Sequence, residues 1–411
     1  MKKDFIELGI TNELSERLLK LRIDTPTQVQ VKSIPYILEG KDVIAQAQTG
    51  TGKTLAFLLP ILEKIDVNSE DTQALIISPT RELAIQISEE AQKLISVKGI
   101  SILSAYGGQD VEKQLNKLKK NIPLVVGTPG RILDLIRRES LDLSKLKMLV
   151  LDEADQMLHM GFLDEVDAIF SYTPSEKQVM CFSATFNKEV KKLAKTYMNE
   201  PHYVSVKGQN VTLDEIDQII VHTTDRKKQE ALCEMIDTQQ PFMAIVFCRT
   251  KRRVTALYED LSQKGYNCDQ LHGDLSQAKR EKVMKDFRNA KIQLLIATDV
   301  AARGIDVDGI THIYNYDMVL DTDTYIHRIG RTGRAGEKGT AVTFVTPKHN
   351  ASLEKLEGDI KADVKKIEMH KAVKHEDGKA KPKAKKKPSF DDFLKKNSKK
   401  NSRHKGRAPK R

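Results

Sequence analysis

The chain has 411 residues, of which 30% are charged and 5% aromatic, with 68 Lys and Arg against 57 Asp and Glu. This length exceeds what one ordinary hydrophobic core organises, so we expect two domains with extensions. No stretch of about 18 apolar residues occurs and the N-terminus lacks an apolar signal core, so we expect neither a membrane-spanning nor an exported protein.

The four cysteines are scattered, without the Cys-x-x-Cys spacing of zinc sites and redox motifs. Cys181 and Cys248 fall inside apolar runs and are expected to be small core residues. Neither a disulfide framework nor a zinc site is supported. A reducing cytoplasm fits this use of cysteine.

From Val43 to about Val206, short apolar runs alternate with helical stretches such as Leu55–Lys64, Arg81–Ser96 and Lys188–Met198. The runs are nearly continuous in Val, Ile and Leu, as expected of parallel strands covered on both faces. The pattern predicts an α/β fold. Its expected strands are residues 43–47, 73–78, 100–105, 124–127, 147–152 and 178–183.

A glycine-rich loop, Ala47-Gln-Thr-Gly-Thr-Gly-Lys-Thr54, follows the first expected strand and precedes a helix, although its first residue is Ala where the general pattern has Gly. In such a loop the backbone N–H groups close on phosphates, the lysine reaches the β and γ oxygens, and the last hydroxyl ligates Mg²⁺. The candidate phosphate-binding residues are Gln48, Thr49, Gly50, Thr51, Gly52, Lys53 and Thr54.

An Asp-Glu-Ala-Asp run at residues 152–155 directly follows the apolar run Met148–Leu151. Asp152, at the end of a buried strand, is suited to hold the same Mg²⁺ ion as Thr54, and Glu153 is suited to orient the attacking water. Each motif alone is a weak signal. Together, each at a transition from strand to loop, they predict hydrolysis of a nucleoside triphosphate.

Residues 207–215 lack periodicity and are expected to be a linker, after which the alternation resumes until about residue 365. This second half contains no further phosphate loop. Two similar domains with one such loop predict a site that the second domain completes. The expected strands here are residues 217–222, 243–248, 292–298, 311–315 and 341–345.

Two blocks of the second half carry candidate chemistry. The block His327-Arg-Ile-Gly-Arg-Thr-Gly-Arg334 contains glycines that disfavour a plain solvated helix face. We interpret its arginines as fingers that neutralise charge on the transferring γ-phosphoryl group. The block Ala297–Asp306 follows an expected strand, so its polar groups lie where open α/β sheets bind ligands.

The positive charge is concentrated at the C-terminus. Residues 371–411 hold 17 Lys and Arg against 4 Asp and Glu, a net charge of +13, so residues 1–370 carry −2 of the total of +11. The tail has too few apolar residues to form a core, although Phe390, Phe393 and Leu394 could form one amphipathic turn. It is either a solubilising extension or an arm that binds a polyanion.

These blocks, in this order, resemble the DEAD-box RNA helicases of superfamily 2 over about residues 5–365, and the short Lys-rich chain resembles the bacterial members. The resemblance implies two tandem RecA-like parallel-sheet domains, residues 1–206 and 216–365, joined by a linker at 207–215 and followed by a disordered basic tail at 366–411. The matching segments are Pro26–Gln30, Ala47–Thr54, Pro79–Leu83, Gly107–Gly108, Thr128–Arg131, Asp152–Asp155, Ser183–Thr185, Val246–Thr250, Gln277–Arg280, Ala297–Asp306 and His327–Arg334.

The resemblance also implies roles for individual residues. Thr27 and Gln30 would read the adenine edge, which makes ATP the expected nucleotide, and amide groups suit that task. Ser183 and Thr185 would bond the region of Asp155 and couple hydrolysis to domain closure, together with His327 of the arginine-rich block.

Other implied roles concern catalysis and RNA. Asp306 would contact ATP from the second domain, with Arg331 and Arg334 as the fingers that act beside Lys53, Asp152 and Glu153. Contacts to RNA would mostly reach phosphates and sugars, which carry no sequence information, and 2′-hydroxyl contacts can distinguish RNA from DNA. The implied RNA-binding residues are Arg81, Gly108, Thr128, Arg131, Arg280 and Thr298.

One segment departs from the family pattern. Three residues before the Pro of the adenine motif the family usually has Phe or Tyr, and here Ile23 follows Arg22. Ile23 can pack on the adenine face but lacks aromatic stacking, so we expect weaker base discrimination. Phe5 stands where the family's isolated upstream aromatic residue falls.

The sequence therefore predicts an ATP-dependent RNA helicase that locally opens short duplexes or remodels RNA–protein complexes. One alternative is an ATP-gated RNA clamp with little unwinding, against which Glu153, Arg331 and Arg334 argue because they suit turnover. Another is a DNA translocase of the same superfamily. We expect a monomeric cytoplasmic core whose partners include RNA and possible ribosomal or mRNA-decay proteins.

Overall fold

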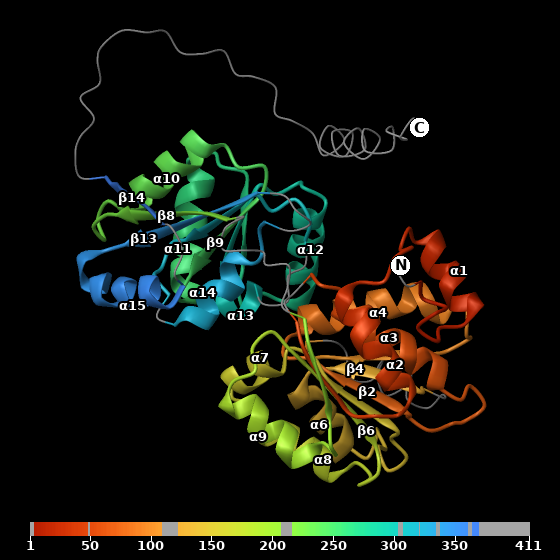
Figure 1. Ribbon diagram of the computed structural model, residues 1–411. Helices are drawn as coiled ribbons and strands as arrows, with labels where there is room; N and C mark the ends of the chain where they lie inside the picture. The colour runs from red at the N-terminus through yellow and green to blue at the C-terminus, as the bar shows by residue number, and fades with distance from the viewer. Residues whose placement is uncertain are drawn as a thin grey trace, which may run out of the picture. The chain divides into compact units, whose positions relative to one another are not determined.

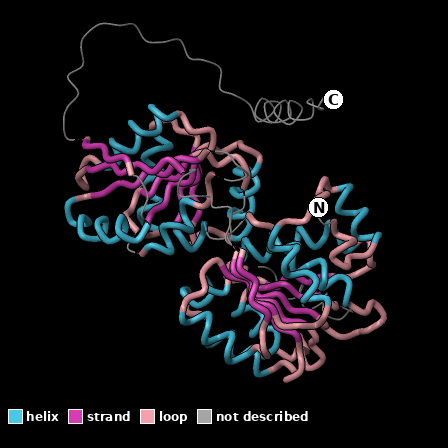
Figure 2. The backbone as a smooth tube through the Cα atoms, in the orientation of Figure 1, coloured by secondary structure: helices cyan, strands magenta, loops and turns pink. Residues whose placement is uncertain are grey.

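The apolar runs predicted to be strands do form strands, and these pair side by side into sheets. The computed structural model describes residues 4–47, 50–108, 122–206, 216–302, 307–319, 321–333, 338–360 and 364–369. Figures 1 and 2 show two groups of strands, each flanked by helices, as the alternating sequence pattern predicts.

The first sheet has seven parallel strands in the order β3-β4-β2-β5-β6-β1-β7. Its strands are β1 (Val43–Gln46), β2 (Ala74–Ile77), β3 (Ile102–Ala105), β4 (Leu124–Gly127), β5 (Met148–Leu151), β6 (Gln178–Ser183) and β7 (His202–Ser205). Its helices are α1 (Asn12–Lys20), α2 (Gln28–Leu38), α3 (Lys53–Lys64), α4 (Arg81–Ile95), α6 (Pro129–Arg137), α7 (Ala154–His159), α8 (Leu163–Ser171) and α9 (Lys188–Tyr197).

The continuous apolar character of these strands is explained by a core on each face of the sheet. Alternate residues point to opposite faces, so Ala74 and Ile76 of β2 join the cluster under α1, α2, α3 and α4. Leu75 and Ile77 join the cluster under α6, α7, α8 and α9. Figure 1 shows α2, α3 and α4 on one side of the strands and α6, α8 and α9 on the other.

The second sheet also has seven parallel strands, in the order β10-β11-β9-β12-β13-β8-β14. Its strands are β8 (Ile216–His222), β9 (Ala244–Cys248), β10 (Cys268–Leu271), β11 (Leu294–Thr298), β12 (His312–Asn315), β13 (Gly339–Val345) and β14 (Lys365–Glu368). The accompanying helices are α10 (Lys228–Gln239), α11 (Lys251–Gln263), α12 (Gln277–Arg288), α13 (Asp299–Ala302), α14 (Thr322–Ile329), the 3₁₀ turn η2 (Pro347–His349) and α15 (Asn350–Ile360).

The two sheets have the same strand order, since each strand of the second occupies the position of the strand seven places earlier in the first. Ala244 and Val246 of β9 join a core cluster that includes residues of α10 and α11, while Ile245 and Phe247, which point the other way, are equally buried. The two similar parallel α/β domains predicted from the sequence are therefore both present. Cys181 and Cys248 are fully buried, as expected, and all four cysteines are free thiols.

Polar residues fix where several helices begin. The side chains of Thr80, Asn187, Thr250 and Asp321 accept hydrogen bonds from backbone N–H groups three residues later, at the starts of α4, α9, α11 and α14. These caps make sharp junctions next to the strand ends. The residues that follow each strand are thereby held at one edge of the sheet.

The expected strand boundaries need small corrections, and three strands were missed. Strands β7, β10 and β14 were not predicted, because they lie at or beside sheet edges and carry polar, partly exposed residues instead of apolar runs. β14 also runs to Glu368, past the expected domain end at residue 365, where it pairs with β8. The expected linker 207–215 and the basic tail 371–411 lie outside the described residues.

The chain divides into two compact units. The first comprises Met1–Thr212 with Gly273–Gln277 and Asp299–Asp306, and the second comprises the remaining residues, so the main division falls inside the expected linker. Among the described residues, every helix is too short or too polar to cross a membrane.

Candidate functional site

The phosphate loop joins β1 to α3, and its shape depends on two glycines. Gly50 and Gly52 have φ angles of 78° and 88°, in the left-handed region that glycine adopts without strain. A Cβ atom at Gly52 would also lie 2.6 Å from Nε2 of Gln30. The loop leads into the first turn of α3, where Lys53 and the partly buried Thr54 stand. Gln48 and Thr49 lie outside the described residues.

Lys53 is the most informative side chain of this loop. It is 7% exposed, and within the part of the chain that the structure describes its Nζ atom has no hydrogen-bond partner. A buried ammonium without a partner is costly, so such a group ordinarily has an anionic ligand in the working protein. The triphosphate of a nucleotide fits this requirement.

Gln30 links the start of α2 to the phosphate loop. Its Oε1 accepts a hydrogen bond from the backbone N–H of Thr27 at 2.8 Å, and its Nε2 donates to the carbonyl oxygen of Gly52 at 2.9 Å. Gln30 is 2% exposed, whereas Thr27 is exposed. The Gln30 amide therefore holds the phosphate loop to the start of α2.

Ile23 and Phe5 have different surroundings. Ile23 is partly buried and packs against the first core cluster, next to Arg22, whose φ of 63° is unusual for a residue with a side chain. Phe5 is only 2% exposed and belongs to that cluster. In this structure the Phe5 ring is a core side chain with little surface left for a ligand.

The acidic run begins where β5 ends. Asp152 is 3% exposed, and its Oδ1 accepts a hydrogen bond from the backbone N–H of Glu153 at 3.0 Å. Burial raises the pKa of the Asp152 carboxyl to about 6; the positive charge of Lys53 opposes this shift, and the negative charges of Glu153 and Asp155 add to it. This carboxylate sits in a site that favours an additional cation.

Glu153 stands in a strained conformation at the start of α7. Its φ and ψ angles are 49° and 50°, in the left-handed region, which costs a residue with a Cβ atom about 1 kcal/mol or more. It is 5% exposed, and its Oε2 has no hydrogen-bond partner among the described residues. Strain and an unsatisfied buried oxygen in one residue indicate a functional group rather than a structural one.

The turn after β6 is tied to the acidic run. Oδ2 of Asp155 accepts hydrogen bonds from both the backbone N–H and the hydroxyl of Thr185, each at 2.9 Å. The Ser183 hydroxyl donates to the carbonyl oxygen of Thr185 at 2.7 Å and lies 3.4 Å from the backbone N of Asp155. The bond between these two motifs, expected from the family resemblance, is present.

The strand order explains why these groups meet. β5, β6 and β1 are adjacent in the sheet, and parallel strands bring their carboxyl ends to one edge. The acidic run, the turn at Ser183 and the phosphate loop follow these three strands. The arrangement is suited to bind a triphosphate, hold a divalent cation and orient a water molecule.

The expected RNA-binding residues of the first domain follow three further strands at that edge. β2, β4 and β3 are likewise adjacent, and Arg81, Gly108 and Thr128 come after them. A Cβ atom at Gly107 would lie 2.8 Å from Nη2 of Arg81, so the segments after β2 and β3 are in contact. Arg131 bonds Asp134 at 2.6 Å.

In the second domain, Arg280 on α12 is 7% exposed and Thr298 at the end of β11 is 8% exposed. His327 is partly buried on α14, and Arg331 is 4% exposed just after that helix. Arg334 and Asp306 lie outside the described residues.

The first arginine of the block, Arg328, has a structural role that the sequence pattern did not indicate. Arg328 is 4% exposed, and its Nη1 donates to Oδ1 of Asn315 at 3.2 Å and to the carbonyl oxygen of Asp317 at 3.0 Å. Its guanidinium lies 4.9 Å from the centre of the Phe247 ring. Arg328 therefore fastens α14 to the ends of β9 and β12.

Asp317 is a second residue that the sequence reasoning missed. Its carboxylate accepts from Nζ of Lys228 at 3.2 Å, Nε of Arg253 at 3.1 Å and the backbone N–H of Arg249 at 2.9 Å. Burial lowers the pKa of Lys228 and Asp317 opposes that shift. Its position just after an apolar strand, in Asn315-Tyr-Asp317, was the available signal.

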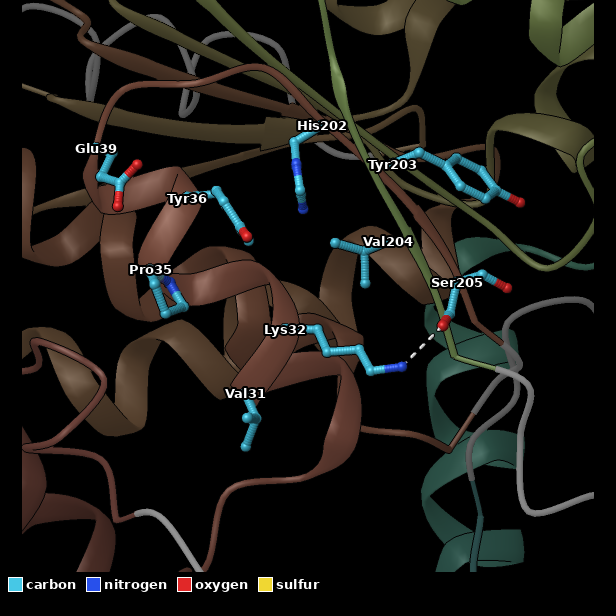
Figure 3. Close-up of a pocket in the computed structure, with 9 residues that line it drawn as sticks. All are labelled: Val31, Lys32, Pro35, Tyr36, Glu39, His202, Tyr203, Val204 and Ser205. Atoms are coloured by element: carbon cyan, nitrogen blue, oxygen red, sulfur yellow. Dashed lines mark hydrogen bonds between the residues drawn. The ribbon is translucent and has the colours of Figure 1, made fainter.

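A cavity of about 500 Å³ lies away from all these groups, between α2 and β7. Its lining includes Lys32 and Tyr36 of α2 and His202 of β7, whose ring stacks on that of Tyr36 with centroids 3.5 Å apart. Figure 3 shows Lys32 reaching the carbonyl oxygen of Ser205 across this cavity. The lining residues are Val31, Lys32, Pro35, Tyr36, Glu39, His202, Tyr203, Val204 and Ser205.

Comparison with known families gives two matches. The profile described as DEAD/DEAH box helicase matches residues 27–193, and the profile described as helicase conserved C-terminal domain matches residues 227–336. Among curated proteins, the DEAD-box ATP-dependent RNA helicase CshA of Geobacillus kaustophilus is 48% identical over 363 residues, covering 88% of this chain and 78% of that protein. The ATP-dependent RNA helicase CshA of Listeria monocytogenes is 48% identical over 353 residues, with coverages of 86% and 68%.

Solved structures agree with these sequence matches. S. cerevisiae Dbp5 bound to RNA and ADP BeF3 is 33% identical with a TM-score of 0.83, covering 90% of this chain and 96% of that chain. Mss116p bound to ssRNA and AMP-PNP is 30% identical with a TM-score of 0.81 and coverages of 89% and 80%.

Proposed function

This chain belongs to the DEAD-box family of ATP-dependent RNA helicases, and from that premise we propose that it uses ATP to open short RNA duplexes or to remodel RNA–protein complexes. Like the family, it has two RecA-like domains, binds RNA and is an RNA-stimulated ATPase. The observation that best supports ATP turnover by this chain is the buried ammonium of Lys53, which has no partner in the described segments and lies beside Asp152.

In the proposed site, the phosphate loop receives the triphosphate. Backbone N–H groups of Gln48–Thr54 cradle the phosphates, and Nζ of Lys53 gains an anionic partner. The Thr54 hydroxyl and the Asp152 carboxylate would hold Mg²⁺, which supplies positive charge to the β and γ oxygens when bound. The raised pKa of Asp152 supports this assignment, because a bound cation would favour its ionised form.

Adenine selection is proposed for Thr27, Gln30 and Ile23. Gln30 already bonds the carbonyl oxygen of Gly52, so a base contact at Gln30 would be felt directly by the phosphate loop. Ile23 offers an aliphatic surface to the base. This arrangement supports ATP as the substrate, with weaker binding of the adenine base than an aromatic ring would give.

Glu153 is the proposed water-positioning residue. Its Oε2 is buried without a hydrogen-bond partner in the described ranges, and its backbone is held in a strained conformation. A water molecule placed for in-line attack on the γ-phosphorus could donate to that oxygen.

The second domain is proposed to complete the reaction with Arg331 and Arg334 as fingers and Asp306 as a nucleotide contact. The support is the sequence, which has two similar domains and a phosphate loop in only the first, together with the strand-for-strand repeat of the sheets. His327, Asp155, Ser183 and Thr185 would couple hydrolysis to domain closure.

RNA is proposed to lie along Arg81, Gly108, Thr128 and Arg131 of the first domain, and along Arg280 and Thr298 of the second. The support is that the first four follow adjacent strands of one sheet edge. Similar proteins have been solved with RNA and a nucleotide bound together. Contacts of these residue types read the backbone and not the base sequence.

We place the reaction in the cytoplasm, in keeping with four free thiols, and in a monomer. Ribosome assembly and mRNA decay are the settings in which protein partners would be sought. An ATP-gated clamp with little unwinding remains the alternative function, and a DNA translocase is the more remote one.

The test measures ATP hydrolysis and strand separation side by side on a short RNA duplex and on its DNA counterpart. We expect RNA-stimulated hydrolysis and ATP-dependent opening of the RNA duplex. The variant Arg331→Ala should lower kcat by roughly 10³, as loss of an arginine finger does, while ATP affinity changes far less. Tight ATP-dependent RNA binding without strand separation would favour the clamp, and equal stimulation by DNA would favour the translocase.

A further inference from the structure

The last strand of the first domain carries a tyrosine that contacts the coupling turn of the nucleotide site. Tyr203 lies on β7, and Figure 3 shows its ring leaving the strand on the side opposite to His202 and Val204. Tyr203 also lines the cavity between α2 and β7, but its ring points away from the Tyr36 and His202 rings that stack there. Tyr203 is 45% exposed and still makes two specific contacts.

The first contact is a hydrogen bond through Gln46. The Tyr203 hydroxyl donates to Oε1 of Gln46, the last residue of β1, and Nε2 of the same amide donates to the carbonyl oxygen of Ala184 at 3.5 Å. The amide group of Gln46 thus connects the phenol to the middle residue of the turn Ser183–Thr185.

The second contact is made by the ring. The Tyr203 and Phe186 rings have centroids 5.1 Å apart and planes inclined by 41°. Phe186 directly follows Thr185, so Tyr203 is connected to this segment at two points: indirectly at Ala184, through Gln46, and directly at Phe186, through its ring.

The turn that Tyr203 holds is the one that bonds Asp155. Thr185 donates two hydrogen bonds to the Asp155 carboxylate, and the carbonyl oxygen of Ser183 accepts from the backbone N–H of Ala47, the first residue of the phosphate loop. β7 pairs with β1 in register, and the segment 207–215 that joins the two domains begins two residues after β7 ends. One side chain therefore connects the nucleotide site to the strand that leads into the linker.

We propose that Tyr203 is a positioning residue for coupling ATP hydrolysis to RNA unwinding. Tyr203 holds the turn Ser183–Thr185 against β7, through Gln46 at Ala184 and through the neighbouring ring of Phe186. A movement of the turn that follows a change at Asp155 is then transmitted to β7, the strand that leads to the linker. Tyr203 touches neither ATP nor RNA in this role. The inference rests on the coupling function proposed above for Asp155 and Thr185.

The test compares Tyr203→Phe, which removes only the hydroxyl, with Tyr203→Ala, which also removes the ring. Tyr172→Phe is the matched control, because Tyr172 is similarly exposed at 49% in the same domain. For each full-length protein one measures KM for ATP, RNA-stimulated kcat, the rate of duplex unwinding and the melting temperature.

We expect the number of duplexes opened per ATP hydrolysed to fall about threefold in Tyr203→Phe and about tenfold in Tyr203→Ala. KM for ATP should stay within about twofold of the wild-type value, and Tyr172→Phe should behave as wild type. An unchanged ratio in both Tyr203 variants would overturn the proposal. So would a parallel fall of hydrolysis and unwinding that follows the melting temperature, because that is the signature of a stability role alone.

Thr185→Ala separates failure of the proposed role of Tyr203 from failure of the proposed coupling. If the coupling function is right, Thr185→Ala itself lowers the unwinding ratio, and adding Tyr203→Phe lowers it by less than twofold further, because both act through one turn. If the two substitutions instead lower the unwinding ratio by independent factors that multiply, the proposed role of Tyr203 is wrong. If Thr185→Ala leaves the ratio unchanged, the coupling function itself has failed, and the role of Tyr203 with it.

Discussion

Two buried polar groups of the nucleotide site have no partner among the described residues, and both sit where a ligand would supply one. Nζ of Lys53 and Oε2 of Glu153 each lose the hydrogen bonds they would have in water, which costs about 1–3 kcal/mol per group and more for a charge. The folded protein bears this cost together with the strained backbone of Glu153. A bound triphosphate would give Nζ of Lys53 an anionic partner, and the proposed attacking water would donate a hydrogen bond to Oε2 of Glu153.

The two groups should respond differently to substitution. In Glu153→Gln the side chain keeps its shape while the carboxylate that accepts a water proton is lost, and Asp152 remains to hold the cation. We expect the variant to bind ATP and RNA with near wild-type affinity yet hydrolyse ATP at least 10²-fold more slowly, so that a complex with both ligands accumulates. Single-turnover hydrolysis and equilibrium binding of a labelled ATP check this.

Glu176→Gln is the control, since Glu176 is exposed in the same domain. Loss of ATP binding in Glu153→Gln would show that Glu153 supports the fold of the site instead of orienting water.

At the scale of elements, the sequence predicted the central strands and missed three of the four strands at sheet edges, β7, β10 and β14. Central strands such as β2 and β5 are buried at every position, so they appear in the sequence as apolar runs and could be predicted. β14 reads Lys-Lys-Ile-Glu and is almost wholly exposed, because an edge strand is held by backbone pairing to a single neighbour. Such backbone pairing requires no pattern of apolar and polar side chains, so the sequence does not reveal it.

The site shows the same division. The phosphate loop, the acidic run and the turn at Ser183 were found because each follows an apolar strand and has a family pattern. Other contacts depend on which distant segments of the chain become neighbours in the fold. They are the bond from Gln30 to Gly52, the bonds by which Arg328 holds α14, and the contacts of Tyr203. Tertiary contacts of this kind have no local signature.

β12 carries a residue that should make the second domain sensitive to acid. Burial lowers the pKa of His312 from 6.5 to about 4. As the pH falls, the unfolded chain takes up the proton near pH 6.5 while the folded chain does not, so stability is full above pH 6.5 and declines toward pH 4. The loss at pH 4 is at most about 3 kcal/mol.

The prediction is that His312→Gln flattens this decline, since glutamine does not titrate. Melting temperatures of both proteins between pH 4.5 and 7.5 provide the measurement, with His159→Gln at an exposed position as the control. If wild type and His312→Gln lose stability with the same slope, another group is responsible for the acid sensitivity.

At the scale of the whole molecule, charge and catalysis are carried by different parts of the chain. All the proposed catalytic and RNA-contacting residues lie within residues 1–370, whose net charge is −2, while residues 371–411 carry +13. We therefore propose that the tail supplies the main electrostatic attraction for a polyanion and that the domains supply the chemistry.

Deleting residues 371–411 should leave kcat at saturating RNA nearly unchanged and raise the RNA concentration needed for half-maximal stimulation. The salt dependence of RNA binding should also flatten, by about 0.7 in log–log slope for each RNA phosphate that the tail neutralises in the full-length protein. Titrations of RNA at several salt concentrations measure both effects.

A tail of the same composition in shuffled order is the matched control, and it should restore binding if charge alone is responsible. Unchanged affinity and slope after deletion would favour a tail that only keeps the protein in solution.

The strand order of the first sheet has a thermodynamic consequence. β2 and β5 are paired neighbours, about 4.8 Å apart, and they are the strands at which the proposed RNA contacts of the sheet edge meet the proposed nucleotide contacts. Ligands bound to loops at one sheet edge influence each other's affinity when each favours a particular arrangement of those loops. Their affinities then obey a reciprocity: whatever factor RNA contributes to ATP binding, ATP must return to RNA binding. A measured asymmetry between these two factors would be an error in one of the titrations or a sign of hydrolysis during the experiment.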